Sequence, residues 1–434
     1  MSHASTESSS SSHYFRFQEL LKKLQDLMAA GEGDSPAGDS VRDEMDALWP
    51  QLTEEEGRRL RGLSADLYAL SGEEIPRTTT SQKTRDELPL RIKEAFEGER
   101  FDEVLDLLRF RPEFLPGHAV AYLRGRCWLE LDDFLPAAWF FDLAASLEPG
   151  HPSYAAMALN ALTMGGRFDE AVERAHRAAA DSSSSSVLLM TAAQALFTAA
   201  KHVSEEKART LYERVIETVT AALARQSPTD RLVNLPGLRS AGRLCRAMAH
   251  ERLGNVGEAG REYDGLLKDD PTDTRSWLIA GLFDLGRDPR RADERFEQAI
   301  RGGTSSPWPY LFLGHSCLLA RDYKRVVELA QHGLNFAQTN SERAILFEWL
   351  GIAQAELSAP VDLVKYLFDA AVTLDPVNMN IRRNREAFEQ AIGAGALASS
   401  AAFDSPPMPD IDQAREAVEA QQARSSVAAM GLAA

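Results

Sequence analysis

Histidines, cysteines and paired carboxylates are the side chains of this sequence that could catalyse a reaction or hold a metal ion. The 434 residues include nine histidines and three cysteines, which are Cys127, Cys245 and Cys317. The cysteines are far apart, and neither a CxxC pair nor a His/Cys cluster with zinc-ligand spacing is present. GxSxG, HExxH and P-loop patterns are also absent from the sequence. We therefore expect no catalytic site, no metal and no cofactor, and do not expect an enzyme.

Two pairs of residues could still suggest acid–base or ligand chemistry. His118 and His151 are separated by one period of a repeating chain, about 34 residues, which predicts equivalent turn positions. Asp132 and Asp133 are neighbours, and adjacent side chains diverge on a helix or a turn, so they cannot form an acid/base pair. We expect both aspartates to lie in a solvated turn.

Composition and charge narrow the class of protein. Hydrophobic residues make up 44% and charged residues 26% of the chain, which is typical of a folded soluble protein. The formal net charge is −17 and no Lys/Arg-rich block occurs, which predicts no nucleic-acid partner and no membrane partner. No run of about 18 apolar residues could span a bilayer. The N-terminus lacks a signal peptide, and the separated cysteines suit a reducing compartment, so we expect the cytoplasm.

The elements that would position any site are repeated helices. Three stretches align, namely GERFDEVLDLL, LDDFLPAAWFF and GGRFDEAVERA, and their aromatic residues Phe101, Phe134 and Phe168 recur at intervals of about 34 residues. Pro116 and Pro149, which follow two of these units, are separated by the same interval. No segment alternates apolar and polar residues as a strand does, and Ala, Leu, Glu and Arg dominate. The pattern predicts repeating helix pairs.

One unit shows which family these helix pairs resemble. In the unit that starts near His118, Gly125 and Trp128 fall on the first helix, and Ala137 and Phe141 on the second. This arrangement resembles the tetratricopeptide repeat, which has a period of about 34 residues, small side chains where its two helices cross and a closing proline. The resemblance implies that Gly125 and Ala137 allow close approach, while Trp128 and Phe141 fill the space between units. Equivalent packing positions in later units are Gly281, Phe296, Gly314, Gly351 and Phe368.

The match departs from the family at some positions, and the chain ends do not match it. Arg124, Arg246 and Val326 stand where the family prefers Leu, Leu and Ala. Near the N-terminus, residues 31–40 are expected to form a loop, and Thr53 with Glu56 predicts a capping box at the start of a helix.

We therefore expect an all-α fold: a tetratricopeptide-like right-handed superhelical solenoid of about eight helix pairs with an N-terminal helical accessory module. The expected order is a disordered Ser-rich tail (1–12), an N-terminal helical accessory region (13–84), a first array (85–226), a hinge or linker (227–239), a second array with a capping helix (240–392) and a largely disordered tail (393–434). Within this last tail, one short helix is expected around residues 412–423. The linker is predicted from its prolines and glycine.

The resemblance also implies where a partner would bind. In this family the first helix of each unit lines an inner groove, and the matching inward positions here are Tyr122, Arg126, Asn160, Trp308, His315 and Glu348. Aromatic and arginine side chains suit protein recognition, although the same positions could simply face water. Only Asn160 fits the family's two-carboxylate clamp, with no neighbouring Lys, so that clamp is not expected.

The predicted function is a non-catalytic scaffold or adaptor that binds a protein or peptide partner in this groove. Two alternatives remain open. The chain could be a structural subunit of a larger assembly, or a regulator whose active or docking element is the N-terminal module. The sequence does not identify the partner.

Overall fold

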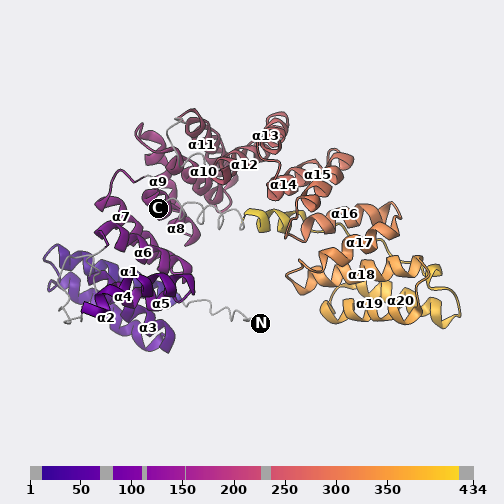
Figure 1. Ribbon diagram of the computed structural model, residues 1–434, viewed down its shortest axis with the longest axis horizontal. Helices are drawn as coiled ribbons and strands as arrows, with labels where there is room; N and C mark the ends of the chain where they lie inside the picture. Colours follow the sequence, from indigo (N-terminus) through magenta and orange to yellow (C-terminus); the bar gives the residue numbers. More distant parts are fainter. Residues whose placement is uncertain (1–11, 69–81, 110–114, 152, 226–235, 420–434) are drawn as a thin grey trace. The chain divides into compact units, whose positions relative to one another are not determined.

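The structure is a computed structural model that describes residues 12–68, 82–109, 115–151, 153–225 and 236–419 (Figure 1). Within these ranges the chain forms α-helices and two short 3-10 helices and no strand. The chain divides into two compact units. Unit 1 is residues 1–233 with 429–434, and unit 2 is residues 234–428. The all-α prediction is confirmed.

Unit 1 begins with three helices that precede the repeats, and these are α1 (Ser12–Ala29), α2 (Pro36–Leu48) and α3 (Glu54–Tyr68), with a 3-10 turn at Trp49–Gln51. The repeated helices then follow as consecutive neighbours. They are α4 (Gln82–Glu97), α5 (Phe101–Arg109), α6 (Gly117–Glu130), α7 (Phe134–Leu147), α8 (Tyr154–Met164), α9 (Phe168–Ala180), α10 (Ser186–Ala200) and α11 (Glu205–Ala224). Each of these packs against the next in sequence, as helix pairs do.

Unit 2 continues the same arrangement. Its helices are α12 (Pro236–Arg252), α13 (Val256–Asp269), α14 (Thr274–Asp284), α15 (Pro289–Arg301), α16 (Trp308–Leu319), α17 (Tyr323–Gly333), α18 (Asn340–Glu356), α19 (Val361–Leu374) and α20 (Met379–Gly393). A 3-10 turn at Ala398–Ser400 and a last helix over residues 411–419 follow. The tetratricopeptide-like array of helix pairs is confirmed, whereas its handedness and its number of repeats stay predictions.

The turn inside a helix pair imposes a special backbone conformation. Asp132 and Arg321, two residues before α7 and α17, have positive φ angles of 60° and 59°. Gly166 and Gly254 have φ of 70° and 77° at the equivalent positions before α9 and α13. Only glycine adopts this left-handed region freely, so the tight turn strains the backbone at Asp132 and Arg321.

Three of the predicted packing glycines lie against an aromatic ring of the neighbouring helix. A Cβ atom on Gly125 would lie 2.7 Å from the Phe141 ring, and one on Gly281 would lie 2.5 Å from the Phe296 ring. A Cβ on Gly351 would lie 3.1 Å from Phe368. In each case the aromatic residue belongs to the second helix of the same pair, so the ring occupies the volume that a side chain would need.

Gly314 packs differently from this prediction. Its Cβ would meet Trp349, at 3.0 Å, and Trp349 lies on α18, the first helix of the next pair. Gly314 therefore allows close approach between successive pairs and not within its own. The other predicted packing residues, Trp128 and Ala137, are buried.

The N-terminal module is built into unit 1. The capping box of Thr53 and Glu56 is confirmed, because Thr53 N donates to Glu56 Oε2 at 2.8 Å and Glu56 N donates to Thr53 Oγ1 at 3.2 Å. The predicted loop over residues 31–40 is wrong from Pro36 onward, because the Ser35 side chain caps α2.

The predicted disorder of the tail is also wrong for residues 401–410, because these residues pack against unit 2 and form specific hydrogen bonds. The short helix expected near residue 412 is present over residues 411–419. A composition rich in Ala, Ser and Pro predicted disorder, but contacts with distant helices order the segment. Residues 420–434 lie outside the described residues, as do residues 1–11 and the linker up to residue 235. The linker therefore remains a prediction over those residues, while residues 236–239 belong to α12.

Candidate functional site

Unit 2 holds a segment of its own chain against its helices. We call residues 401–419 the C-terminal segment; its last nine residues form the short yellow helix in Figure 1. We call the surface that it contacts the first-helix face, since it is formed mainly by α12, α16, α18 and α20. Three of these, α12, α16 and α18, are the first helices of their pairs.

Two side chains of this face bind the main chain of the segment. Asn384 on α20 donates from Nδ2 to the carbonyl oxygen of Asp404 at 3.1 Å and accepts from the Asp404 amide at 2.6 Å. His315 on α16 lies with Nε2 at 3.1 Å from the Pro406 carbonyl oxygen. Since a carbonyl oxygen can only accept, Nε2 carries the proton in this arrangement. These contacts do not depend on the side chains of the segment.

The apolar contacts of the segment recur every three residues. Phe403 is half-buried with its ring centroid 5.7 Å from that of Phe368, and Pro406 and Pro409 are buried. The residues between them, 404, 405, 407 and 408, are exposed. A period of three is that of a polyproline II helix, which has no internal hydrogen bonds and leaves its main chain free for partners.

The helical end of the segment packs against the start of unit 2. Asp410 caps this helix, accepting from the amides of Asp412 at 2.9 Å and Gln413 at 3.1 Å. Ala414 and Val418, one helical turn apart, are 0% and 2% exposed. Arg415 makes a two-pronged ion pair with Glu251 on α12, with N–O distances of 2.8 and 3.1 Å. The segment therefore runs opposite to the order of the repeats.

Glu348 on α18 is a buried carboxylate beside this site. Its side chain is 2% exposed, and its Oε1 accepts from Asn380 Nδ2 and Asn384 Nδ2, each at 2.8 Å. Burial raises the pKa of Glu348 to about 7, although the two asparagine hydrogen bonds oppose the shift. The hydrogen bonds of Glu348 hold the Asn384 amide in the orientation that meets Asp404.

The three groove residues predicted in unit 2 all lie at this face, but none is free. Trp308 and Glu348 line a cavity of about 250 Å³ together with Pro406, Pro407, Met408 and Pro409. His315 is bonded to Pro406, and burial lowers its pKa. The prediction did not include Asn384 or the segment itself. The spacing of Phe403, Pro406 and Pro409 could have indicated that segment.

The predicted groove residues of unit 1 are packed among their neighbours. Tyr122 is 8% exposed, and its hydroxyl accepts from Arg126 Nη1 at 3.2 Å. Arg126 also pairs with Glu130 at 3.2 Å and lies over the Phe96 ring at 5.6 Å. Asn160 is 6% exposed and contacts Met164 Sδ at 3.3 Å. Partner binding at these residues remains a prediction.

The histidine pair belongs to an aromatic cluster around Tyr154. His151 stacks on the Tyr154 ring with a centroid distance of 3.9 Å, and His118 Nδ1 lies 2.9 Å from the Tyr154 hydroxyl. The turn prediction holds for His151, whereas His118 lies on α6. Both histidines therefore pack the start of α8.

Unit 1 joins its N-terminal module to the repeats through buried charges. Arg109 on α5 bonds Asp66 on α3 at 2.8 Å, and Asp66 is fully buried. Arg124, which stands where the family prefers Leu, is 4% exposed and lies 3.8 Å from the same carboxylate. The buried aspartate of the module thus accounts for the departure from the repeat pattern.

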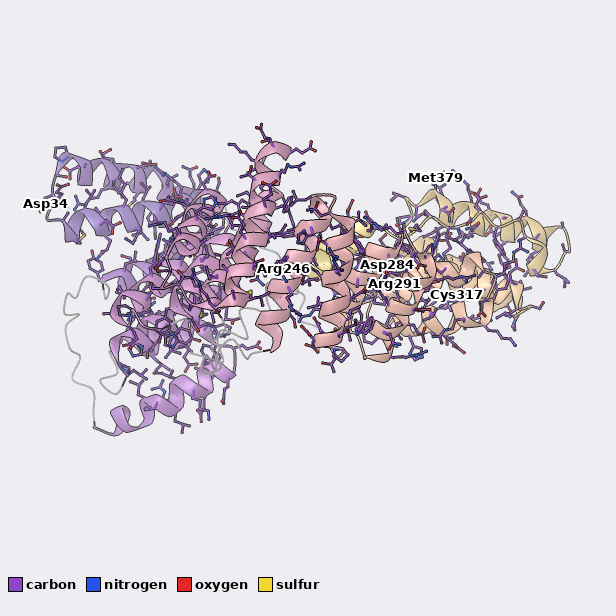
Figure 2. All side chains as sticks on the ribbon, turned by 90° about the horizontal axis from the view of Figure 1, so that it is seen from above. Asp34, Arg246, Asp284, Arg291, Cys317 and Met379 are labelled. Carbon is purple, nitrogen blue, oxygen red and sulfur yellow. The ribbon has the colours of Figure 1, made fainter. Side chains whose placement is uncertain are left out.

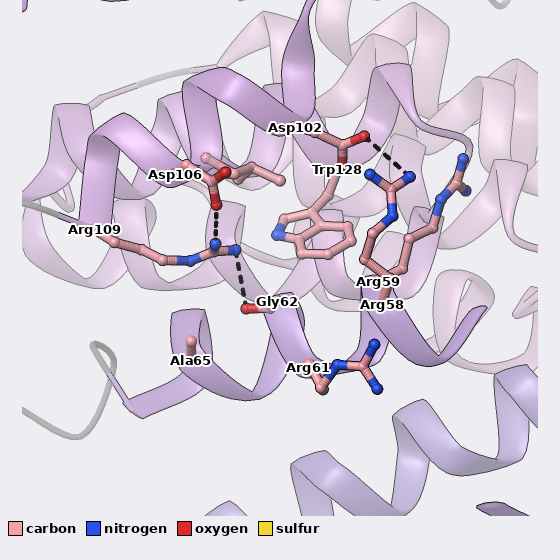
Figure 3. A pocket seen from close by; sticks show the side chains of 10 residues that line it. Arg58, Arg59, Arg61, Gly62, Ala65, Asp102, Asp106, Arg109 and Trp128 are labelled. Carbon is pink, nitrogen blue, oxygen red and sulfur yellow. Dashed lines mark hydrogen bonds and ion pairs between the residues drawn. The ribbon is translucent and has the colours of Figure 1, made fainter. Parts of the chain in front are cut away.

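A cavity of about 340 Å³ opens beside this junction, as Figure 3 shows. Its walls carry Arg58, Arg59, Arg61, Arg109, Asp102, Asp106 and Trp128. Two of the arginines have partners that Figure 3 shows. Arg109 also binds Asp106 and the Gly62 carbonyl oxygen, and Arg58 lies 3.8 Å from Asp102. The cavity is thus lined largely by charged groups that are already paired.

Asp133 is the second buried carboxylate at this junction. Asp132 is not buried, but Asp133 is 2% exposed and accepts from the Tyr14 hydroxyl at 2.9 Å and from Gln18 Nε2 at 2.8 Å. The prediction of a solvated turn is therefore wrong for Asp133, because α1 covers it. Burial raises the pKa of Asp133 to about 6, and its hydrogen bonds and Arg59 oppose the shift.

Unit 2 has a comparable charge network between α14 and α15. Asp284 lies 3.3 Å from Arg291 Nε and 3.1 Å from Arg295 Nη1, and Figure 2 shows Asp284 and Arg291 close together. The described ranges contain no group of three His, Cys, Asp or Glu side chains placed to hold a metal ion. None of their helices has the length and apolar character needed to cross a membrane.

No family model matches the sequence, and no curated protein matches it. A tetratricopeptide repeat protein from Parabacteroides merdae is 13% identical, covering 63% of this chain and 99% of that chain with a TM-score of 0.39. The human IFIT1 dimer with PPP-AAAA is 14% identical, covering 99% and 96% with a TM-score of 0.39. Yeast Tom70 is 12% identical, covering 80% and 97% with a TM-score of 0.26.

The fold is assigned from the helix pairs of the structure itself. The aromatic residues Phe101, Phe134 and Phe168 each begin the second helix of a pair, and they recur at the repeat period of about 34 residues. The glycines of the pairs meet aromatic rings where the helices cross. The described helices therefore form a tetratricopeptide-like array of helix pairs, as the sequence predicted.

Proposed function

We propose that this protein is a non-catalytic scaffold or adaptor that binds a segment of another protein on its first-helix face. One observation carries the proposal: the face in unit 2 already holds an extended segment of the chain itself through Asn384 and His315. A surface that pairs with the main chain of an extended segment gains affinity from these hydrogen bonds, and pockets for the side chains add specificity.

The alternatives make different use of the same surfaces. A structural subunit would bury its helices against fixed neighbours in an assembly. A regulator would use α1–α3. However, Tyr14 on α1 bonds the buried Asp133 of the repeats, and the buried Asp66 on α3 bonds Arg109 of the repeats, so these helices are poorly placed to dock elsewhere. The absence of a nucleic-acid partner stays a prediction, since one similar structure, that of IFIT1, was solved with PPP-AAAA.

Affinity capture with the full-length chain, followed by hydrogen exchange on the purified complex, tests the proposal. We expect the partner to slow amide exchange in α16, α18 and α20. As a matched control, Arg261→Ala changes an exposed side chain on α13 and should leave capture unchanged. Protection confined to α1–α3 would instead support the regulator, and a chain that is insoluble without fixed partners would support the structural subunit.

A further inference from the structure

We propose that residues 403–418 are an internal ligand of the first-helix face of unit 2, and that the partner which replaces them has the same chemistry. That partner is an extended segment with an aromatic residue and prolines three and six positions later, followed by a short helix that carries an arginine. This inference rests on the proposed function and specifies its partner.

The spacing of the buried residues defines the extended part of the ligand. Phe403, Pro406 and Pro409 face the helices, while the residues between them are exposed. Proline fixes φ near the polyproline II value, so two prolines in this register reduce the entropy lost when the segment binds. A partner without prolines would bind the same hydrogen-bonding groups with a larger entropic cost.

The hydrogen bonds define what the face requires of any occupant. Asn384 contacts both the amide and the carbonyl of one residue, and His315 contacts the carbonyl two residues later. Residues 402–410 lie outside any helix, so their main-chain groups are free to make these hydrogen bonds. The face therefore selects a backbone conformation first and a side chain second, through Phe403 on Phe368.

The helix at the end of the segment sets its direction. Arg415 reaches Glu251 on α12, whereas Phe403 and Asp404 contact α19 and α20 near the other end of unit 2. Glu251 is also held by the Tyr263 hydroxyl at 3.1 Å. A carboxylate that is fixed in this way favours an arginine, which can bind both of its oxygens.

A partner peptide can replace the internal ligand because it can make the same contacts with the first-helix face. Its hydrogen bonds to Asn384 and His315 are made by main-chain groups, and both sides of these bonds can be hydrated when the segment leaves. The Arg415–Glu251 ion pair can likewise be replaced by an arginine of the partner. Its link to α20 is short, from Gly393 to Ala402, so the segment competes at a high effective concentration. A partner of the same chemistry therefore binds the intact chain more weakly than it binds a chain whose own segment is disabled.

The test uses the full-length protein and a fluorescent peptide of residues 401–419. A released variant carries Phe403→Ala, Pro406→Glu and Pro409→Glu, which remove the aromatic contact and place carboxylates near Glu348. We expect the released variant to bind the peptide at least ten-fold more tightly than the wild type. Adding Asn384→Ala to the released variant should weaken that binding at least ten-fold.

Two controls separate recognition from misfolding. Arg385 lies on the same helix as Asn384 but pairs with Asp369 and Glu389. Arg385→Ala should therefore leave peptide binding by the released variant unchanged. A peptide with the three released-variant substitutions should not bind. Circular dichroism should show the same helical content for all variants.

Several outcomes would overturn the inference. Equal peptide binding by the wild type and the released variant would show that residues 403–418 do not occupy the face. No peptide binding by the released variant would show that the ligand chemistry is wrong. A captured partner that the peptide fails to displace would leave the adaptor function standing and refute this inference. Peptide binding by a chain that captures no protein would support this inference and refute the adaptor function.

Discussion

The two ends of the chain are both packed against helix pairs, but by different kinds of contact. The N-terminal module is held in unit 1 by buried charged and polar groups, above all Asp66 with Arg109 and Asp133 with Tyr14. The C-terminal segment is held in unit 2 mainly by main-chain hydrogen bonds, by Phe403 and by prolines, with one ion pair between Arg415 and Glu251. Separating buried charges leaves them uncompensated, whereas separated main-chain groups can bind water.

This difference indicates that the N-terminal module stays bound to its repeats, whereas the C-terminal segment can be displaced. The module contributes the counter-charges that the first repeats need, so the repeats and the module form one folding unit. The C-terminal segment contributes groups that an outside peptide can also supply.

Arg109→Ala should have the largest effect on stability. It leaves the fully buried Asp66 with Arg124 at 3.8 Å as its remaining cation, so we expect a loss of about 3–5 kcal/mol in unit 1. Native-state hydrogen exchange of α3, α5 and α6 measures the loss. Arg58→Ala removes an exposed ion pair with Asp102 and should change stability by less than about 1 kcal/mol. Equal effects of the two substitutions would contradict the idea of a charge-linked module.

Because Asp133 is buried, we expect the stability of the same junction to depend on pH. Its folded-state pKa of about 6 lies above the ordinary value of 3.8, so the folded state binds the proton more tightly than the unfolded state. Its contribution to stability should therefore be largest below pH 4 and fall as pH rises to about 6, by up to about 3 kcal/mol. Asp133→Asn removes the titrating group while its amide oxygen can still accept one of the two hydrogen bonds, and it should abolish this slope in exchange measurements on α7. A slope that persists in the variant would assign it to another group.

Gly281→Ala tests the array separately from either end. The added Cβ would lie 2.5 Å from the Phe296 ring, so we expect a loss of about 1–3 kcal/mol in unit 2 from overpacking. Gly265→Ala is the matched control, because its Cβ would meet nothing within 4 Å and alanine favours a helix. Thermal melting followed by circular dichroism distinguishes the two. An unchanged melting temperature for Gly281→Ala would show that the helix crossing is placed wrongly.

Arg415→Ala should have the smallest effect on the unit and a clear effect on the segment. Glu251 keeps its hydrogen bond from Tyr263, so we expect global stability to change by about 1 kcal/mol or less. Amide exchange in residues 411–419 should become about five- to ten-fold faster, while α12 and α13 keep their protection. Loss of protection throughout unit 2 would show that the segment is as integral as the N-terminal module.

The repeat could be predicted from the sequence because its signals are local and recur. The aromatic residues Phe101, Phe134 and Phe168, and the glycines that meet rings about half a repeat later, lie within one or two helices of their partners. A periodic pattern of this kind needs no knowledge of distant contacts, and it correctly predicted the all-α fold and the helix pairs.

Long-range pairing was decided only by the tertiary structure. Asp133 is buried because Tyr14, 119 residues earlier in the chain, lies over it, and His315 meets Pro406 across 91 residues. The Ala-, Ser- and Pro-rich composition of the tail predicted disorder, but the order of residues 401–419 comes from hydrogen bonds to Asn384 and His315 and from Glu251, 164 residues from Arg415. A local pattern determines helices, whereas the burial of a polar group depends on what the rest of the chain places beside it.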